Sequence, residues 1–193
     1  MGSPCQDFSR KRRAAPTGNG LAMLAEFSRC VQEAAPPWFL LENVPGVPSV
    51  DVPGYAVQRF NLNAAECGGR QYRLRTFQFG SCDGKVLVPD RKDTPGRLEP
   101  ACLAMDGPNR RAFPDFCEQQ GLPRDFDLPG LSLTAKYRAI GNGVPVYMAR
   151  VLARAIRDRV DAADVTLCAC GCGRAVTGRK GRKCVTAGCR KRL

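Results

Sequence analysis

The order of apolar and polar positions in the first fifty residues predicts one helix followed by one buried strand. Apolar side chains recur at helical spacing over residues 21–31, and this helix must end before Pro36 because proline cannot continue a helix. The apolar run 38–41 is typical of a buried strand, and residues 42–46 are expected to form the turn that follows it.

Three later segments extend this pattern. Thr76–Phe79 alternates between polar and apolar side chains, as a second strand would, and it stops at Gly80. Residues 85–89 are predicted to form one arm of a hairpin, and apolar positions at helical spacing over 146–160 predict a last helix. Because helices, buried strands and loops alternate, the expected fold class is α/β with a sheet domain.

The composition limits the chemistry that the chain can perform. Its 193 residues include eleven cysteines and no histidine. The absence of histidine excludes Ser-His and Cys-His catalytic pairs and any zinc site that uses imidazole. No apolar run is long enough to span a membrane, and the N-terminus has no signal-peptide pattern. We therefore expect a cytoplasmic protein with reduced thiols and no membrane partner. The compact architecture favours a bacterium or a phage-infected host as its source.

Positive charge is concentrated near the C-terminus. The formal net charge is +12, and residues 165–193 hold eight basic residues, five of the cysteines and no acidic residue. Such a charge balance favours a polyanionic partner. We therefore expect a body of about 1–160 followed by a basic, cysteine-dense tail.

Four short segments of the body carry candidate chemistry, and each has an ordinary structural explanation when it is taken alone. These explanations are an incidental loop, a solvated turn, an exposed polar strand face and a common helix start. In chain order the segments are Pro4-Cys5-Gln6, Glu42-Asn43-Val44, Gln71-Tyr72-Arg73-Leu74-Arg75 and Gly141-Asn142-Gly143-Val144-Pro145. The glutamine and both arginines of the third segment occupy alternate positions, which would share one face of a strand.

In this order and spacing, the four segments closely resemble the DNA cytosine-5 methyltransferase family. Residues 62–65 and 120–126 fit two further elements of that family, and the resemblance covers about residues 1–157. It implies an S-adenosylmethionine-dependent, Rossmann-like methyltransferase fold. The implied reaction transfers a methyl group from S-adenosylmethionine to carbon 5 of a cytosine that has flipped out of double-stranded DNA.

The resemblance also implies a role for each residue. Cys5 would add to carbon 6 of the base, a task that suits a thiol because it is partly ionised near neutral pH. Glu42 would hydrogen-bond ring nitrogen 3 and the exocyclic amine, while Arg73 and Arg75 would hold the base and the neighbouring phosphate. Further substrate contacts are implied for Pro4, Gln6, Asn43, Val44 and Gln71, and cofactor contacts for Asn142 and Val144.

Part of the family's pattern does not occur in this sequence. The glycine-rich turn and the acidic residue that hold S-adenosylmethionine are absent, as is the strand that leads into the catalytic loop. We interpret the chain as the C-terminal part of a methyltransferase that lacks the N-terminal strands, and we expect weak or absent activity when it is alone. A split enzyme with its N-terminal half on a second chain, a truncated gene model and a decayed remnant are the alternatives.

The expected organisation has four parts. Residues 1–80 and 107–160 would form the catalytic domain, and residues 81–106 would form a short target-recognition region between them. Residues 165–193 would form a separate zinc-binding tail. A non-catalytic DNA-binding remnant that works through this tail is the alternative to an enzyme.

The tail resembles a small zinc ribbon or treble-clef-like finger. Tetrahedral zinc takes four ligands, and the tail offers five thiols. Cys172 and Cys189 are the expected ligands, joined by two of Cys168, Cys170 and Cys184. A segment of 29 residues with so few large apolar side chains needs a metal ion to fold. The alternative is a disordered basic tail with incidental cysteines.

Overall fold

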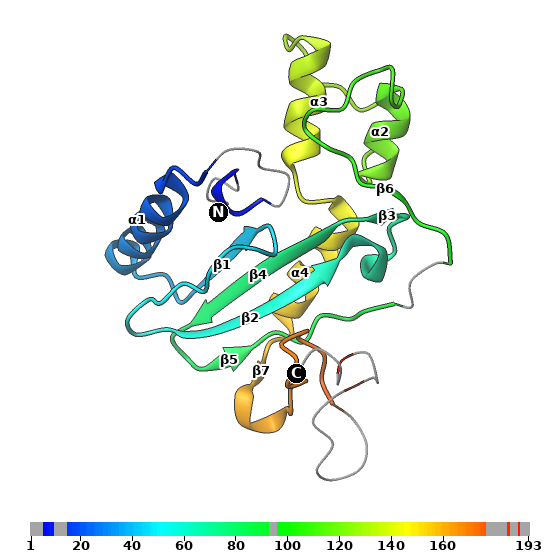
Figure 1. The fold of residues 1–193 in the computed structure, drawn as a ribbon. Coiled ribbons are helices and arrows are strands. Elements are labelled where there is room, and N and C mark those ends of the chain that lie inside the picture. The colour runs from blue at the N-terminus through cyan, green and yellow to red at the C-terminus, as the bar shows by residue number, and fades with distance from the viewer. Residues whose placement is uncertain (1–5, 10–14, 93–95, 177–184, 186–188, 190–193) are drawn as a thin grey trace. The chain divides into compact units, whose positions relative to one another are not determined.

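The computed structural model describes residues 6–9, 15–92, 96–176, 185 and 189, and it is a mixed α/β structure (Figure 1). The chain divides into two compact units. The first contains residues 1–62, 74–89 and 155–193, and the second contains residues 63–73 and 90–154. Among the described residues, no helix is both long enough and apolar enough to cross a lipid bilayer.

Among the described residues, the first unit is organised around a sheet whose strands lie in the order β1-β4-β2. These strands are β1 (Trp38–Asn43), β4 (Leu74–Ser81) and β2 (Ala56–Asn63). The predicted strand after Pro36 is therefore confirmed, although it extends through the two residues expected in a turn. Strand β1 runs antiparallel to β4. An apolar run reports burial and carries no information about strand direction.

Helix α1 (Asn19–Ala34) covers one face of this sheet and confirms the predicted helix. Phe27 of this helix packs edge-on against Phe39 of β1, with the ring centroids 5.4 Å apart. Phe39 lies opposite Gly80, where an added Cβ atom would stand 2.1 Å from the Phe39 ring. Gly80 thus leaves room for the ring, and β4 continues past the glycine that was expected to end it.

Shorter elements complete the first unit. Strand β5 (Lys85–Val86) pairs antiparallel with β7 (Val160–Asp161), which is followed by the 3-10 helix η3 (Ala162–Asp164). The hairpin predicted for residues 85–89 is wrong in its partner, because β5 pairs with a strand that lies over seventy positions away in the sequence. The 3-10 helix η1 (Gln6–Phe8) packs against α1.

The second unit is mainly helical. It contains η2 (Ala64–Cys67), α2 (Phe113–Gln119), α3 (Leu133–Asn142) and the first part of α4 (Val146–Arg157). Its buried side chains include Cys102, Phe116, Cys117, Tyr137 and Ile140. Helix α4 confirms the predicted last helix, whereas α2 and α3 were not predicted.

Two expectations about the second unit need correction. Gly141 and Asn142 were expected in a turn that opens the last helix, but they are the final residues of α3. Residues 71–75 were expected to form one strand, but β3 (Gln71–Tyr72) ends before Arg73 and pairs in parallel with β6 (Glu99–Pro100). The chain leaves the second unit after Arg73, so the motif is divided between the two units.

Candidate active site

The first unit brings Glu42 and Arg75 together. The Arg75 Nε atom lies 3.0 Å from Glu42 Oε1, and their side chains are 19% and 24% exposed. An ion pair with this exposure is held in place by the sheet and remains open to a solute. The contact joins two of the four residues for which the family resemblance implies a catalytic role.

The register of the sheet explains this contact. Glu42 lies opposite Phe77, and Arg75 is two residues from Phe77 along β4. Residues two apart on a strand share a face, so Glu42 and Arg75 are diagonal neighbours within reach of long side chains. Asn43 has the opposite orientation and is buried, and its Oδ1 atom accepts a hydrogen bond from the Val44 amide at 2.7 Å.

The segment that follows Cys5 packs beside the end of β1. Cys5 and Pro4 lie outside the described residues, and Gln6 is exposed at the start of η1. Gly46 lies against Phe8, because an added Cβ atom there would stand 2.5 Å from the Phe8 carbonyl oxygen. The described segment that directly follows Cys5 in the sequence therefore contacts the turn after Glu42.

Asp7 fixes this segment to the start of α1. Its Oδ2 atom accepts a hydrogen bond from the Gly20 amide at 2.7 Å, and its Oδ1 atom accepts one from the Thr17 amide at 3.2 Å. The first amides of a helix have no partner within the helix, so a carboxylate at this position is stabilising. Sequence reasoning assigned no role to Asp7.

Arg73 lies in the second unit, where its surroundings differ from those of Arg75. It is 3% exposed. Its Nη1 atom donates to the Cys102 carbonyl at 2.6 Å, and its Nη2 atom donates to the carbonyls of Gly141 and Gly143 at 2.9 and 3.0 Å. Among the described contacts, the guanidinium therefore binds the backbone around the end of α3.

Gln71 is part of the same buried network. Its Oε1 atom accepts a hydrogen bond from the Cys102 amide at 3.0 Å, and its Nε2 atom donates to the Gln119 carbonyl at 2.8 Å. It also lies 2.7 Å from the hydroxyl of Tyr147, whose pKa burial raises to about 12. The hydroxyl stays protonated and donates to the Gln119 carbonyl at 2.8 Å.

The two residues predicted to face the cofactor follow this network along the chain. Asn142 is exposed at the end of α3, and Val144 is partly buried in the link to α4. Gly141 packs so closely against residues 103–104 that an added Cβ atom would stand 2.6 Å from the Leu103 backbone. Together with Arg73, this contact fixes the backbone on which Asn142 stands.

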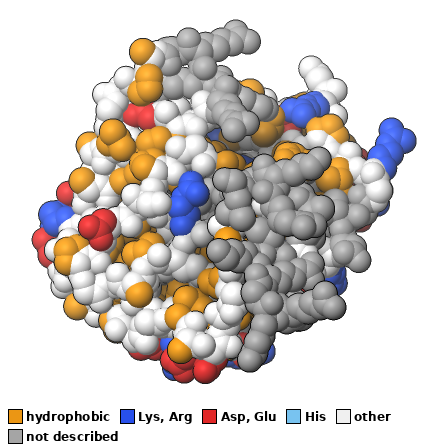
Figure 2. All heavy atoms as spheres, turned by 60° about the horizontal axis from the view of Figure 1, so that its bottom comes forward, with side chains coloured by type: hydrophobic (Ala, Val, Ile, Leu, Met, Phe, Trp, Pro, Cys, Tyr) orange, Lys and Arg blue, Asp and Glu red, His pale blue; other side chains and the backbone are white. Residues whose placement is uncertain are grey.

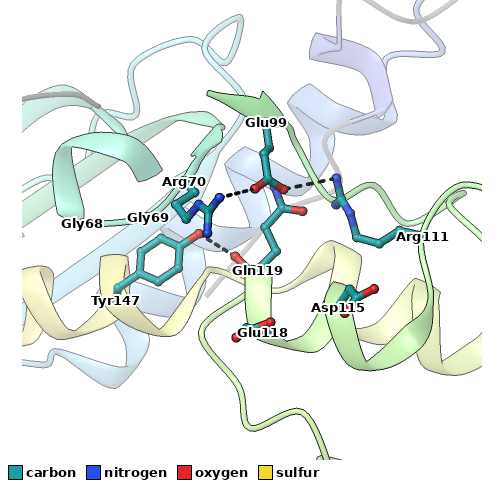
Figure 3. Close-up of a pocket in the computed structure, with 9 residues that line it drawn as sticks. All are labelled: Gly68, Gly69, Arg70, Glu99, Arg111, Asp115, Glu118, Gln119 and Tyr147. Carbon is teal, nitrogen blue, oxygen red and sulfur yellow. Dashed lines mark hydrogen bonds and ion pairs between the residues drawn. The ribbon is translucent and has the colours of Figure 1, made fainter. Parts of the chain in front are cut away.

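A cavity of about 460 Å³ opens in the second unit, at the side chains drawn in Figure 3. Arg70 and Arg111 both approach Glu99, at 3.3 and 4.0 Å. Two further carboxylates of the lining, those of Asp115 and Glu118, pair with Arg124, which lies outside the lining. The other lining residues of the cavity are Gly68, Gly69, Gln119 and Tyr147.

Four tail cysteines form a second candidate site, in the first unit. The Sγ atoms of Cys168, Cys170, Cys172 and Cys189 all lie within 4.8 Å of one another. Tetrahedral zinc with Zn–S bonds of about 2.3 Å needs sulfur atoms about 3.8 Å apart, so small movements would complete a site. The fifth predicted ligand, Cys184, lies outside the described residues.

The surroundings of these thiols favour a thiolate at Cys168. Burial acts to raise the pKa of Cys168, but hydrogen bonds from the amides of Cys170 and Val185 and from neighbouring thiols outweigh it and lower that pKa. Burial raises the pKa of Cys170, as does its hydrogen bond to the Cys168 sulfur. A group of buried thiols that share protons in this way is the environment in which a thiophilic cation replaces the protons.

The basic charge of the tail falls mostly on residues whose structure is not described. Among its eight bases, Arg174 is described, and the other seven lie at 179–183 and 190–192. On the face shown in Figure 2, the Lys and Arg side chains of the described residues lie apart from one another. The polyanionic partner expected from the charge of the tail therefore stays a prediction.

Comparisons with known proteins agree with this fold. Solved structures of the Entamoeba histolytica methyltransferase EhMeth and the S. pombe Dnmt2 methyltransferase superpose with TM-scores of 0.54 and 0.55 at 11% and 12% identity. Each match covers 82% of this chain and 76% of the other. At such identities the similarity concerns the fold, which is that of a methyltransferase.

Sequence relatives define the family. Residues 1–95 match the model of the C-5 cytosine-specific DNA methylase family, and over this segment the chain belongs to that family. The type II methyltransferase M.AgeI of Thalassovita gelatinovora is 31% identical over 157 residues, covering 66% of this chain. The type II methyltransferase M.AquIA of a Picosynechococcus species is 36% identical over 109 residues, covering 45% of it. The chain spans 36% and 44% of the lengths of these two relatives.

Proposed function

We propose that this chain carries the base-activating part of a DNA cytosine-5 methyltransferase, with double-stranded DNA as its substrate. The contact between Glu42 and Arg75 is the observation that supports this proposal most strongly. It joins two of the charged side chains to which the family resemblance assigns a role at the base, on strands whose register places them within reach of each other. The type II relatives favour a role as the modification component of a restriction-modification system.

The proposed chemistry follows from the residue types. The Cys5 thiolate adds to carbon 6 of the flipped cytosine, and the electron pair of the ring double bond moves toward nitrogen 3, where the Glu42 carboxyl group donates a proton. This addition makes carbon 5 nucleophilic, and a bound S-adenosylmethionine would supply the methyl group that carbon 5 takes up. Transfer of the carbon 5 proton to a base such as water, return of the nitrogen 3 proton to Glu42 and expulsion of the thiolate restore the aromatic ring. Arg75 orients Glu42 and balances its charge whenever the carboxyl group is ionised.

The methyl donor of the family is S-adenosylmethionine, and the described residues offer only part of a site for it. Asn142 can supply an amide and Val144 an apolar contact, whereas a nucleoside with an amino-acid group needs more partners than these. We therefore derive no step through the donor from this chain. We propose that the remaining contacts come from residues outside this chain, which spans 36% and 44% of the lengths of two type II relatives.

For Gln71 and Arg73, we propose a positioning role in place of the direct substrate contact expected from the sequence. Their side chains are buried and bind the backbone at 102, 119 and 141–143. Both residues thus support the segment that carries Asn142. Of the two arginines in the motif, Arg75 would then be the one that contacts the base.

For the tail, we propose zinc binding through Cys168, Cys170, Cys172 and Cys189. The mutual proximity of their sulfur atoms supports this set. All four ligands are soft thiolates, which select zinc over the hard cations magnesium and calcium.

A covalent-trapping experiment tests the proposed reaction. DNA duplexes that contain 5-fluorocytosine retain the enzyme because fluorine at carbon 5 cannot leave as a proton does. The chain is incubated with this DNA and S-adenosylmethionine, with and without the N-terminal half of a type II relative. We expect a denaturation-resistant adduct in the presence of the added half, and its loss in Cys5→Ser.

Matched variants separate chemistry from folding. Glu42→Gln should reduce the rate of adduct formation roughly 100-fold or more, as expected for loss of a general acid. Glu33→Gln changes an exposed glutamate of α1 that pairs with Arg29, and it should have no effect. If no adduct forms under either condition, the reaction proposal is wrong and the alternative of a non-catalytic DNA-binding remnant is favoured.

A further inference from the structure

The cysteine cluster is built on a short hairpin. Leu167 and Ala175 form an antiparallel bridge, and the Cys168 amide donates to the Arg174 carbonyl at 2.8 Å. Gly171 and Gly173 supply the two positive φ angles, +70° and +73°, that a tight reversal here requires. The hairpin places Cys168, Cys170 and Cys172 around one point, where Cys189 joins them.

This hairpin is packed onto the sheet of the first unit. A Cβ atom added at Gly173 would stand 2.8 Å from Phe60 Cβ and 2.9 Å from Phe60 Cγ, so the glycine backbone lies directly on that side chain. Phe60 belongs to β2 and is completely buried. A finger tethered by a flexible linker would make no such contact.

The contact continues from Phe60 to the candidate active site. The ring of Phe60 stacks on that of Phe77 in β4, with centroids 5.9 Å apart. Phe77 is the cross-strand partner of Glu42, and Arg75 lies two residues from it. Three successive contacts therefore join the hairpin, through two aromatic rings, to the ion pair.

We propose that the four-cysteine cluster is a structural zinc site of the catalytic sheet itself, so that metal loading stabilises the strands that carry Glu42 and Arg75. This inference rests on the zinc binding proposed above, and it adds that the stability of the sheet depends on the bound zinc. The described part of the hairpin has few apolar side chains beyond its cysteines, so its shape depends on the bonds between sulfur and metal. Loss of the metal releases Gly173 from Phe60 and opens that side of the core to water.

The single tryptophan of the chain makes this dependence measurable. Trp38 lies on β1, and its ring is 6.2 Å from that of Phe79 on β4. Its fluorescence therefore reports the β1–β4 pairing. The full chain, with its thiols kept reduced, is heated with bound zinc and again after removal of zinc by a chelator. A chromogenic chelator measures the zinc released. We expect about one zinc per chain and a fall of roughly 5–10 °C in the Trp38 midpoint after its removal.

Two glycine variants form a matched pair for the contact. Gly171→Ala and Gly173→Ala each place a side chain at a positive φ, with the same backbone strain, but only residue 173 has Phe60 within 4 Å. Both variants should retain zinc. Zinc removal should lower the Trp38 midpoint of Gly171→Ala as in the parent chain, and it should have less than half that effect in Gly173→Ala.

Each outcome has a distinct meaning. Release of zinc with no change in the Trp38 midpoint of the parent chain overturns the coupling and leaves the zinc site standing. Absence of bound zinc overturns both the zinc site and the coupling. Neither result bears on the proposed reaction, because the 5-fluorocytosine adduct tests that separately.

Discussion

Replacing Arg73 with methionine should loosen the end of α3. The variant keeps a long apolar side chain in the buried position and removes every donor. Three backbone carbonyls, at Cys102, Gly141 and Gly143, then lose their hydrogen bonds to the guanidinium. A buried carbonyl left without a partner costs about 1–3 kcal/mol, so the gross loss is on the order of 3–9 kcal/mol.

Part of this loss is offset. Burying the guanidinium itself costs several kcal/mol in the parent chain, and the variant does not bear that cost. The carbonyls at the end of α3 also gain access to water when the segment moves. The expected net loss is about 3 kcal/mol, which corresponds to a fall of roughly 6–12 °C in the unfolding temperature of a chain of this size.

Thermal unfolding followed by circular dichroism measures the total effect, and hydrogen exchange with mass spectrometry locates it. Exchange should accelerate in peptides that cover residues 140–147, since Arg73 binds the backbone there. Arg70→Met is the control, because the Arg70 side chain is 81% exposed and pairs with Glu99 at the surface. A stability of Arg73→Met within about 1 kcal/mol of the parent, with unchanged exchange at 140–147, would refute the positioning role.

Three further predictions concern the loop, the helix start and alkaline pH. Gly46→Ala places a Cβ atom against the Phe8 backbone, so it should destabilise the chain by about 1–3 kcal/mol and slow adduct formation. Gly96→Ala is the control, because its Cβ atom enters open space and should change neither the stability nor the rate. Asp7→Ala removes the acceptor at the start of α1 and should cost about 1 kcal/mol in chemical denaturation. Burial raises the pKa of Cys102 from 9.0 to about 11, so the unfolded chain ionises this thiol first. The buried neutral thiol should therefore contribute fully to the free energy of unfolding below pH 9, and this contribution should decline as the pH rises to about 11. In Cys102→Ala, the free energy of unfolding from chemical denaturation should fall less between pH 9 and pH 11 than in the parent chain.

The sequence was sufficient to predict elements that bury one face against a neighbour. Helix α1 and strand β1 were predicted correctly because their apolar spacing by itself specifies a buried face. Helices α2 and α3 were missed because they are short, seven and ten residues, so too few apolar positions repeat along them to show a helical period. The partner of β5 was also missed, because no local pattern reports a strand that pairs across more than seventy residues.

The cysteine ligands show a different limit. Spacing alone left the choice among Cys168, Cys170 and Cys184 open, because many loops can bring two of these thiols to a metal. The structure groups Cys168 and Cys170 with Cys172, since the hairpin reverses at Gly171 and points all three sulfur atoms inward. The grouping of these three described thiols thus depends on two glycine φ angles, which a count of cysteines does not contain.

The two arginines of the motif show why alternation was misleading at the candidate site. Their spacing predicts one shared face, but Arg73 is 3% exposed in one unit and Arg75 contacts Glu42 in the other. The strand is interrupted because the Arg73 amide donates to Asn63 Oδ1 at 3.0 Å, and Asn63 also caps η2 by accepting from the Ala65 amide. An amide used in this way cannot join a strand ladder, so β4 begins only at Leu74. Asn63 therefore determines which arginine of the motif reaches the sheet.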